Sequence, residues 1–219
     1  MNKKVYIALA AIVLVSLACS FSTTSTPTTS GGQSSNVLFQ DDFSNTNSGW
    51  PSRSDNGDIM GYENGAYRIY LASTMTDLVA NADQSLQADV VIDVDVTKAG
   101  GSDNNDFGIT CRMKDLNNFY FFEASSDGYA VIGMFLDNQM KYLSSEAMVQ
   151  VNGINSGSTL NHMRAECIGS NLKLYVNGNL VAQVTDSTFT SGGDVGLIAG
   201  SFSDSGIDIR FDNFIVTKP

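Results

Sequence analysis

The stretch that decides the fold is Leu172–Val181, with the sequence LKLYVNGNLV. Asn177-Gly178 suits a two-residue type I′ turn, because both central positions of that turn need a positive φ. The stretch therefore predicts two short strands joined by a tight hairpin turn. A two-residue loop also sets the register, and the predicted pairs are Val176–Asn179, Tyr175–Leu180 and Leu174–Val181.

Both faces of this hairpin are largely apolar, since paired residues share a face. The predicted faces are Leu172, Leu174, Val176 and Val181 on one side, and Tyr175, Leu180, Ala182 and Val184 on the other. A hairpin with two apolar faces fits inside a stack of two sheets better than it fits alone in water.

The remaining chain consists of short apolar runs separated by Gly, Asn, Ser and Asp, with 20 glycines and 3 prolines. Turn signals at this spacing indicate an all-β chain, and we predict a two-sheet antiparallel jelly-roll sandwich. We expect a polar loop over 44–58 and a short helical turn within 73–83. The predicted strands are 37–43, 65–71, 86–96, 107–113, 118–124, 129–136, 140–143, 160–168, 195–199 and 207–217.

The chain is acidic, with 23 Asp and Glu against 12 Lys and Arg and a formal net charge of −11. Such a surface repels phosphate backbones, so we do not expect nucleic acid as a partner. Neutral sugars, divalent cations and basic partners are compatible with it.

The first residues form a secretory signal. Met1–Lys4 is basic, Val5–Val15 is an apolar run, and Ser16–Cys19 closes it with small residues and a cysteine. This ending resembles the bacterial lipobox, although Ser16 stands where Leu or Val is commoner. The resemblance implies a signal peptide over 1–18, cleavage before Cys19, and acylation of Cys19. The alternatives are a plain secreted protein and an uncleaved anchor.

Residues 20–36 are rich in Ser and Thr and lack periodicity, so 19–36 is predicted to be a lipidated cysteine and a tether. The expected location is the cell membrane or outer membrane, with a domain over 37–219 facing outside the cytoplasm. Several acyl chains would hold the protein stably on a membrane.

Several short patterns of the domain occur in a familiar order: Asp41–Phe43, Phe107–Arg112, Asn118–Phe122, Leu174–Gly178, Gly193–Leu197 and Phe211–Phe214. Together they resemble the concanavalin A-like, laminin G-like jelly-roll superfamily over Val37–Pro219. The bacterial extracytoplasmic branch with 3-keto-disaccharide hydrolase-like domains is especially similar. The resemblance implies a lectin, a carbohydrate-binding module, a glucanase or an adhesive domain, and so does not decide the function.

Two cysteines remain in the domain, Cys111 and Cys167, and each shares a strand face with apolar residues. Outside the cytoplasm a buried pair tends to oxidise, so we predict a disulfide between them. The alternative is two separate small core residues.

No catalytic constellation is complete. The glucanase branch of the superfamily carries Glu-x-Asp-x-x-Glu on one strand, whereas Glu123–Asp127 lacks the third acid and Asp89, Asp93 and Asp95 have no glutamate beside them. His162 is the only histidine, and no serine lies in a nucleophile elbow. These absences favour binding without catalysis.

Sugar binding needs aromatic faces and hydrogen-bonding side chains. In the superfamily the ligand often lies on the concave sheet or at its rim. The residues that we predict to contact a ligand are Arg112, Tyr120, Glu123, Tyr129 and Trp50, with Tyr129 and Trp50 at the rim. The alternative for each is packing or plain surface. Tyr175 and Leu180 form a second possible contact surface.

Calcium is the most plausible metal, because Ca²⁺ takes oxygen ligands from Asp, Asn and the backbone. Related jelly rolls often hold this ion between their first and last strands. The residues here that correspond are Asp41, Asp42 and Asp212, and Asp103–Asp106 is a second oxygen-rich loop. The alternative is that these residues only form Asx turns.

The sequence thus favours a membrane-anchored extracytoplasmic lipoprotein that binds a glycan or a cell-surface protein without catalysis. No cofactor is expected apart from a possible structural calcium. A glycoside-acting enzyme and a purely structural adhesion or assembly domain stay open as alternatives.

Overall fold

The computed structural model describes residues 36–219. The predicted signal peptide, the predicted acylation at Cys19 and the predicted tether up to residue 35 lie outside the described residues. Within 36–219 the chain forms 16 strands and no helix, which confirms the all-β prediction. None of the segments within 36–219 is a helix with the length and apolar character needed to cross a membrane.

The strands form two antiparallel sheets. The nine-stranded sheet runs in the order β14 (Asn179–Thr185), β13 (Asn171–Val176), β12 (Asn161–Ile168), β6 (Val90–Gly100), β16 (Ile207–Thr217), β4 (Ala66–Leu71), β3 (Asp58–Glu63) and β2 (Arg53–Asp55), with β1 (Val37–Asp41) also paired to β16. The seven-stranded sheet runs β10 (Gln139–Tyr142), β9 (Tyr129–Leu136), β8 (Asn118–Ser125), β7 (Asp106–Asp115), β15 (Asp194–Ser201) and β5 (Thr76–Asn81), with β11 (Val149–Gln150) paired to β9.

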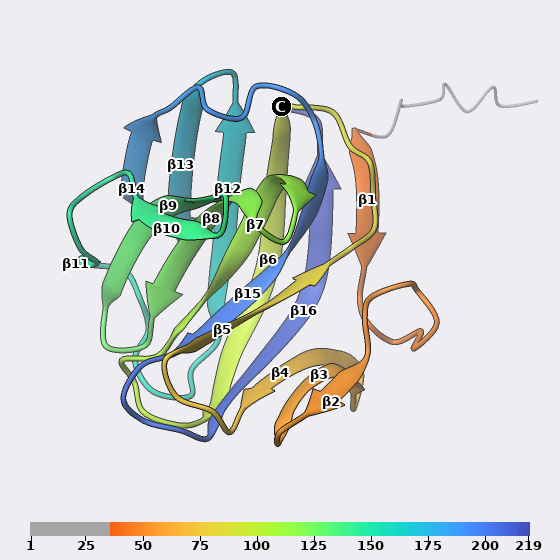
Figure 1. Cartoon of the computed structure of the whole chain (residues 1–219), viewed down its shortest axis with the longest axis vertical. Coiled ribbons are helices and arrows are strands. Elements are labelled where there is room, and N and C mark those ends of the chain that lie inside the picture. The colour runs from red at the N-terminus through yellow and green to blue at the C-terminus, as the bar shows by residue number, and fades with distance from the viewer. Residues whose placement is uncertain (1–35) are drawn as a thin grey trace, which may run out of the picture. The chain divides into compact units, whose positions relative to one another are not determined.

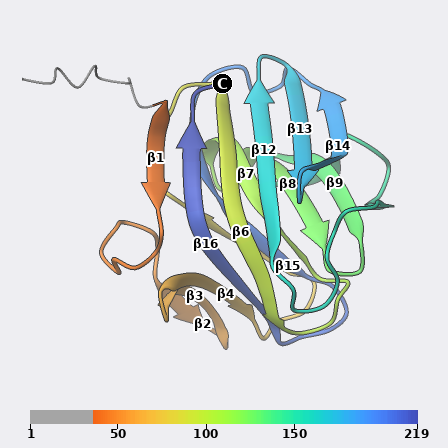
Figure 2. The same ribbon diagram turned by 180° about the vertical axis from the view of Figure 1, so that it is seen from behind.

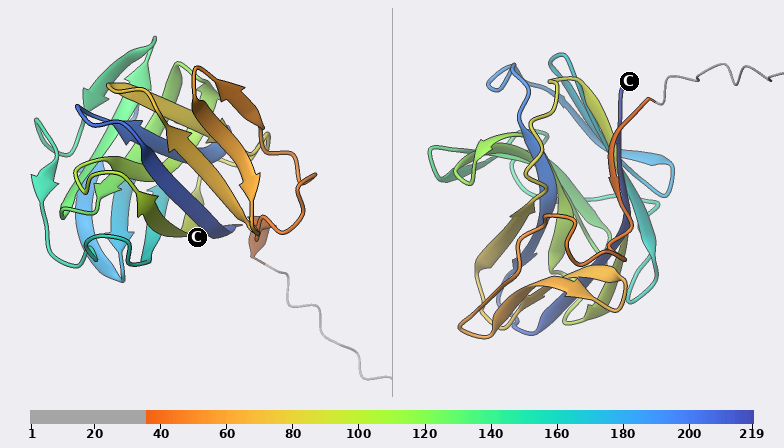
Figure 3. Two further views of the ribbon diagram at one scale, coloured as in Figure 1. Left: turned by 90° about the horizontal axis from the view of Figure 1, so that it is seen from below. Right: turned by 90° about the vertical axis from the view of Figure 1, so that its right-hand side faces the viewer.

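The two sheets stack face to face as a jelly-roll sandwich. Figure 1 shows the seven-stranded sheet in front, Figure 2 shows the nine-stranded sheet from behind, and the side view in Figure 3 separates the two layers. Alternate residues of each strand enter the space between them, as the period of two requires. On β6 these are Val90, Ile92, Val94 and Val96, all essentially unexposed.

The Asn-Gly hairpin forms as predicted at its turn, where Asn177 has φ 49° and Gly178 has φ 79°. The first two predicted pairs are confirmed, but Leu174 pairs with Ala182 instead of Val181. A β-bulge adds one residue to β14 here, so the residues after it change face. Ala182 and Val184 therefore lie on the same face as Leu174, and the predicted division of the faces is wrong beyond the bulge.

Two further predictions are wrong for local reasons. Residues 76–81 are strand β5 and not part of a helical turn, because Leu78, Ala80 and Ala82 alternate into the core. The predicted loop over 44–58 contains the short strand β2 and the first residue of β3.

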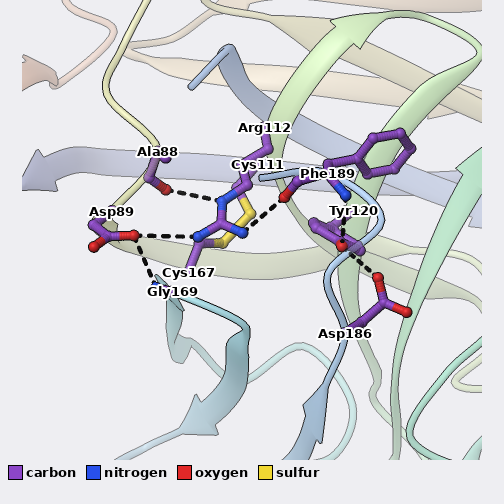
Figure 4. The surroundings of a disulfide bond; sticks show 9 residues. All are labelled: Ala88, Asp89, Cys111, Arg112, Tyr120, Cys167, Gly169, Asp186 and Phe189. Atoms are coloured by element: carbon purple, nitrogen blue, oxygen red, sulfur yellow. Dashed lines mark hydrogen bonds and ion pairs between the residues drawn. A yellow bond between two sulfur atoms is a disulfide. The ribbon is translucent and has the colours of Figure 1, made fainter. Parts of the chain in front are cut away.

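The predicted disulfide between Cys111 and Cys167 is confirmed. It joins β7 of the seven-stranded sheet to β12 of the nine-stranded sheet, across the core (Figure 4). The bond closes a sequence separation of 56 residues, so it restrains the two layers against separation.

Candidate functional site

The outer face of the seven-stranded sheet carries a second apolar cluster, separate from the core. On β8, Tyr120 and Phe122 point into the core, whereas Phe119 and Phe121 point outward. The buried members of the outer cluster are Met113, Phe119, Phe121, Val131 and Ile198, and the partly buried ones are Val79, Phe135, Tyr142 and Met148. A sheet face turned away from the core is ordinarily polar, so this face is unusual.

Four aromatic rings of this face form a connected group, which we call the aromatic row: Phe119, Phe121, Phe135 and Tyr142. Phe119 and Phe135 stack with ring centroids 5.0 Å apart. Phe121 contacts Phe135 at 5.8 Å and Tyr142, edge to face, at 6.2 Å. Tyr142 is only half-buried, so its ring is a part of the row that an external molecule can reach.

Three carboxyl groups lie on the same face, and we call them the carboxyl cluster: Asp77 of β5, Asp106 of β7 and Glu123 of β8. Asp77 and Asp106 both pair with Gly200 of β15, which lies between them. Their Oδ1 atoms lie within 2.4 Å of one point, where a Cβ atom on Gly200 would stand. The absence of a side chain at Gly200 lets the two carboxyl groups meet.

The carboxyl cluster is poorly solvated. Asp106 and Glu123 are each 4% exposed, and Oδ1 of Asp106 has no hydrogen-bond partner. Burial and the charge of Asp77 raise the pKa of Asp106 to about 7. Burial and the charges of Asp106 and Asp77 raise the pKa of Glu123 well above its ordinary value. These carboxyl groups therefore keep protons at a pH where surface acids have lost theirs.

Asp77 is the accessible member of the carboxyl cluster. Its side chain is exposed, although partial desolvation still raises its pKa. No ion pair between described residues involves any of the three acids. The cluster thus has a route to solvent and lacks a basic side chain to neutralise it.

Tyr142 links the aromatic row to the carboxyl cluster. Desolvation raises the pKa of its phenol to about 12, and the charges of Glu123, Asp106 and Asp77 add to the shift. The phenol stays protonated and can donate a hydrogen bond. The buried hydroxyl of Thr110, on β7, also has no hydrogen-bond partner.

The opposite end of the same sheet is hollowed. A surface hollow of about 440 Å³ lies where β5, β7 and β15 end, and its lining includes Asn81, Gln84, Met113, Lys114, Leu116 and Asp194. Met113 belongs to the outer apolar cluster, so the hollow adjoins it. Aromatic rings, carboxyl groups and a polar hollow together give the hydrogen-bonding and stacking groups that a polyhydroxylated ligand needs.

Two of the sequence-predicted contact residues lie on this face. Glu123 belongs to the carboxyl cluster, and Tyr129 is half-buried on β9, where alternation from Val131 places it on the same side. The structure therefore brings Glu123 and Tyr129 to one face, but it does not bring the other three candidates there.

Arg112 lies inside the protein and does not face a groove. It is 2% exposed, has a left-handed backbone (φ 50°), and sits where β7 loses register with β8. Its guanidinium donates to the carbonyls of Ala88 (2.9 Å) and Phe189 (2.8 Å) and pairs with Asp89 (Figure 4). The guanidinium is buried and held by groups of the protein itself, so the predicted groove position of Arg112 is wrong.

Tyr120 and Trp50 are also internal. The Tyr120 hydroxyl bonds Asp186 and accepts from the backbone of Phe189, beside the disulfide (Figure 4). Trp50 is 4% exposed and packs against Phe43 (5.3 Å) and Phe214 (5.1 Å). The loop of Trp50 folds inward because its ring completes an aromatic cluster, so the predicted rim position is wrong.

The residues predicted to bind calcium accept hydrogen bonds from nearby backbone N–H groups. Asp41 accepts from the backbone of Phe43 (2.8 Å) and Asp42 from that of Ser44, as Asx turns do, whereas Asp212 accepts from the backbone of the adjacent Asn213. Asp41 and Asp42 line a hollow of about 380 Å³, but Asp212 does not. Within 36–219 no three acidic, His or Cys side chains are arranged to hold a metal ion, and calcium stays a prediction.

The sequence analysis missed Asp77 and Tyr142, and it included Asp106 only as part of a possible calcium-binding loop. Asp77 fell in the segment predicted as a helical turn, and Asp106 fell in a predicted loop one residue before its strand. The period-two pattern of Leu78, Ala80 and Ala82 could have revealed β5 and placed Asp77 on the outer face. No sequence signal reveals that Asp77 and Asp106 meet over Gly200, since that depends on strand order.

No family model matches this chain, and comparison with curated proteins finds no match. Solved structures do resemble it. The carbohydrate-binding module CBM66 from Bacillus subtilis has a TM-score of 0.62 at 17% identity, covering 78% of this chain and 96% of its own. A Bacillus subtilis protein of unknown function with a galectin-like fold has a TM-score of 0.63 at 9% identity, covering 83% and 96%.

A β-glucanase from Bacillus licheniformis has a TM-score of 0.57 at 14% identity, with 83% of this chain and 98% of the enzyme covered. At these identities the similarity is one of fold. The described residues therefore share the two-sheet jelly-roll fold of these proteins, as predicted.

Proposed function

We propose that this chain is a glycan-binding domain and that the glycan lies on the outer face of the seven-stranded sheet. The proposal rests on one observation: the aromatic row and the carboxyl cluster lie on the same face of one sheet. Sugar rings stack their apolar faces on aromatic side chains, and carboxyl groups bond their hydroxyls. The proposal needs no catalysis.

The fold similarities support this proposal, because proteins named for carbohydrate binding and glucan chemistry share the architecture. A fold hosts many functions, so the site itself is the stronger support. The disulfide supports an extracytoplasmic location, since such bonds persist in oxidising compartments. Acylation of Cys19 and a membrane location complete the proposal.

A glycan array probed with residues 34–219, a compact unit, tests binding. Tyr142→Ala removes the exposed part of the aromatic row, and Tyr175→Ala is the matched control on the nine-stranded sheet. We expect glycans that bind the wild type to lose affinity about 10-fold or more with Tyr142→Ala and to keep it with Tyr175→Ala. Binding to no glycan would favour the structural alternative.

Mass spectrometry of the full chain expressed in bacteria tests the anchor. We expect the mature chain to begin at an acylated Cys19, and Cys19→Ala to release the protein from membranes. A soluble product with an unmodified Cys19 would contradict the anchor and leave glycan binding unaffected.

A second candidate function is glycoside cleavage, and a specific observation favours it. The pKa of Asp106 is raised to about 7 and the pKa of Glu123 is raised well above its ordinary value, which is the direction that a general acid for sugar chemistry needs. Chromatography of array-positive glycans and of a 3-keto-glycoside after incubation would detect products. Product release that is lost with Glu123→Gln would establish an enzyme, and intact substrates would leave binding as the function.

A further inference from the structure

The carboxyl cluster lacks a counter-charge. Asp106 and Glu123 are almost fully buried, and Oδ1 of Asp106 has no hydrogen-bond partner although Oδ1 of Asp77 lies beside the same point over Gly200. A carboxylate in such a place needs a proton or a cation beside it, because burying an unpaired charge is costly.

The residues of 36–219 do not supply this cation. Lys114 donates to the backbone carbonyls of Ser191 and Gly192. Lys98 is bonded to Gly101 and Asp103, and Arg68 is held by Asp208. A positive charge at the carboxyl cluster must therefore come from outside the described chain.

We propose that the ligand of this face carries a protonated amine, as an amino sugar with a free amino group does, and that the ammonium binds at Asp77 and Asp106. The inference rests on the proposed glycan-binding function and narrows its ligand class. Asp77 is the point of entry, because it is the exposed member of the cluster.

An ammonium group fits the cluster better than a metal ion does. Within the described residues no three candidate ligands are arranged around a metal. An ammonium group donates three hydrogen bonds and needs no ordered shell of six to eight oxygens. The charges of all three acids act on the phenol of Tyr142, so this aromatic side chain lies near the cluster, and aromatic rings attract cations.

Three tetrasaccharides with one β-1,4 backbone test the inference. They differ at carbon 2 of each sugar, which carries a hydroxyl in the glucose form, an acetamido group in the N-acetylglucosamine form and an ammonium in the glucosamine form. We expect calorimetry at about pH 7, the pKa of Asp106, to show at least ~10-fold tighter binding of the glucosamine form to residues 34–219, and a preference that shrinks as salt is added.

Asp77→Asn and Asp106→Asn should each reduce the preference for the amine to less than about 3-fold. Asp55→Asn makes the same change at an exposed acid of β2 and should leave the preference intact. The salt dependence of the wild-type preference for the amine tests the ionic interaction without any variant.

Equal or tighter binding of the hydroxyl or acetamido form would overturn the amine inference and leave the glycan-binding function standing. If none of the three tetrasaccharides binds, the amine inference is overturned as well. The glycan array alone then tests the proposed glycan-binding function. A preference that survives Asp77→Asn and Asp106→Asn would place the ammonium elsewhere and overturn the assignment.

Discussion

Oδ1 of Asp106 lies 2.3 Å from the point where a Cβ atom on Gly200 would stand. The relationship shows that the glycine is part of the site, since only a residue without a side chain leaves room for the carboxyl group there. Two acids on strands that are not neighbours can then approach each other across β15.

Gly200→Ala should therefore force Asp106 and Asp77 aside and destabilise the fold by about 1–3 kcal/mol. Gly100→Ala is the matched control, because its Cβ would meet Asp208 at an ordinary 3.5 Å. Urea unfolding of the two variants measures the difference. Equal stability of both variants and the wild type would contradict the close approach over Gly200.

The pH dependence of stability should reflect Asp106. Its pKa is about 7 in the folded chain against an ordinary 3.8, so folding takes up a proton between these values. Stability should increase as pH falls from 8 to about 5.5, with a slope approaching about 1.4 kcal/mol per pH unit near the steepest point.

Asp106→Asn removes this proton uptake, so its stability should change less over the same range and exceed that of the wild type at pH 8. Urea unfolding at several pH values measures both slopes, and the difference between the proteins isolates the contribution of this residue. Parallel slopes would show that Asp106 titrates normally in the fold.

The disulfide should contribute about 4 kcal/mol, because it closes a loop of about 56 residues in the unfolded chain. Residues 34–219 contain only Cys111 and Cys167, so a reductant acts on this pair alone. We expect the Cys111→Ala/Cys167→Ala variant to unfold at lower denaturant, as the reduced wild type does. Coincident curves with and without reductant would contradict the bond.

Arg112→Lys should be costly although it keeps the charge. Lysine cannot reach Ala88, Phe189 and Asp89 with one planar group, so we expect a loss of about 2–4 kcal/mol. Arg164→Lys, at an exposed arginine paired with Asp93, should cost less than about 1 kcal/mol. Thermal unfolding compares them. Glycan affinity of folded Arg112→Lys should be unchanged, and a selective loss of affinity would return Arg112 to the site.

Much of the fold was predictable from local pattern. Asn177-Gly178 determined the central turn, and the alternation from Val90 to Val96 determined a half-buried strand. The β14 bulge opposite Leu174 was not predictable. Both faces of that hairpin are apolar, so either register buries a similar apolar surface.

The site was predictable only in part. Glu123 was predicted to contact a ligand, and it does lie on the outer face of the seven-stranded sheet. Arg112 was misplaced because alternation assigned it to an outer face, whereas a left-handed residue in the strand turns it inward. The predicted position of Trp50 was wrong because the polar sequence around it does not indicate that its ring faces the core. Such errors arise from tertiary packing, which short-range sequence pattern does not determine.

The most direct test of the glycan site is an NMR titration of residues 34–219 with the tightest-binding glycan of the array. The account predicts that the amide signals that shift most belong to the outer face of the seven-stranded sheet, around Asp77, Phe121 and Tyr142. Shifts centred on Arg164 and Tyr175 of the other sheet, or no shift with any glycan, would contradict it.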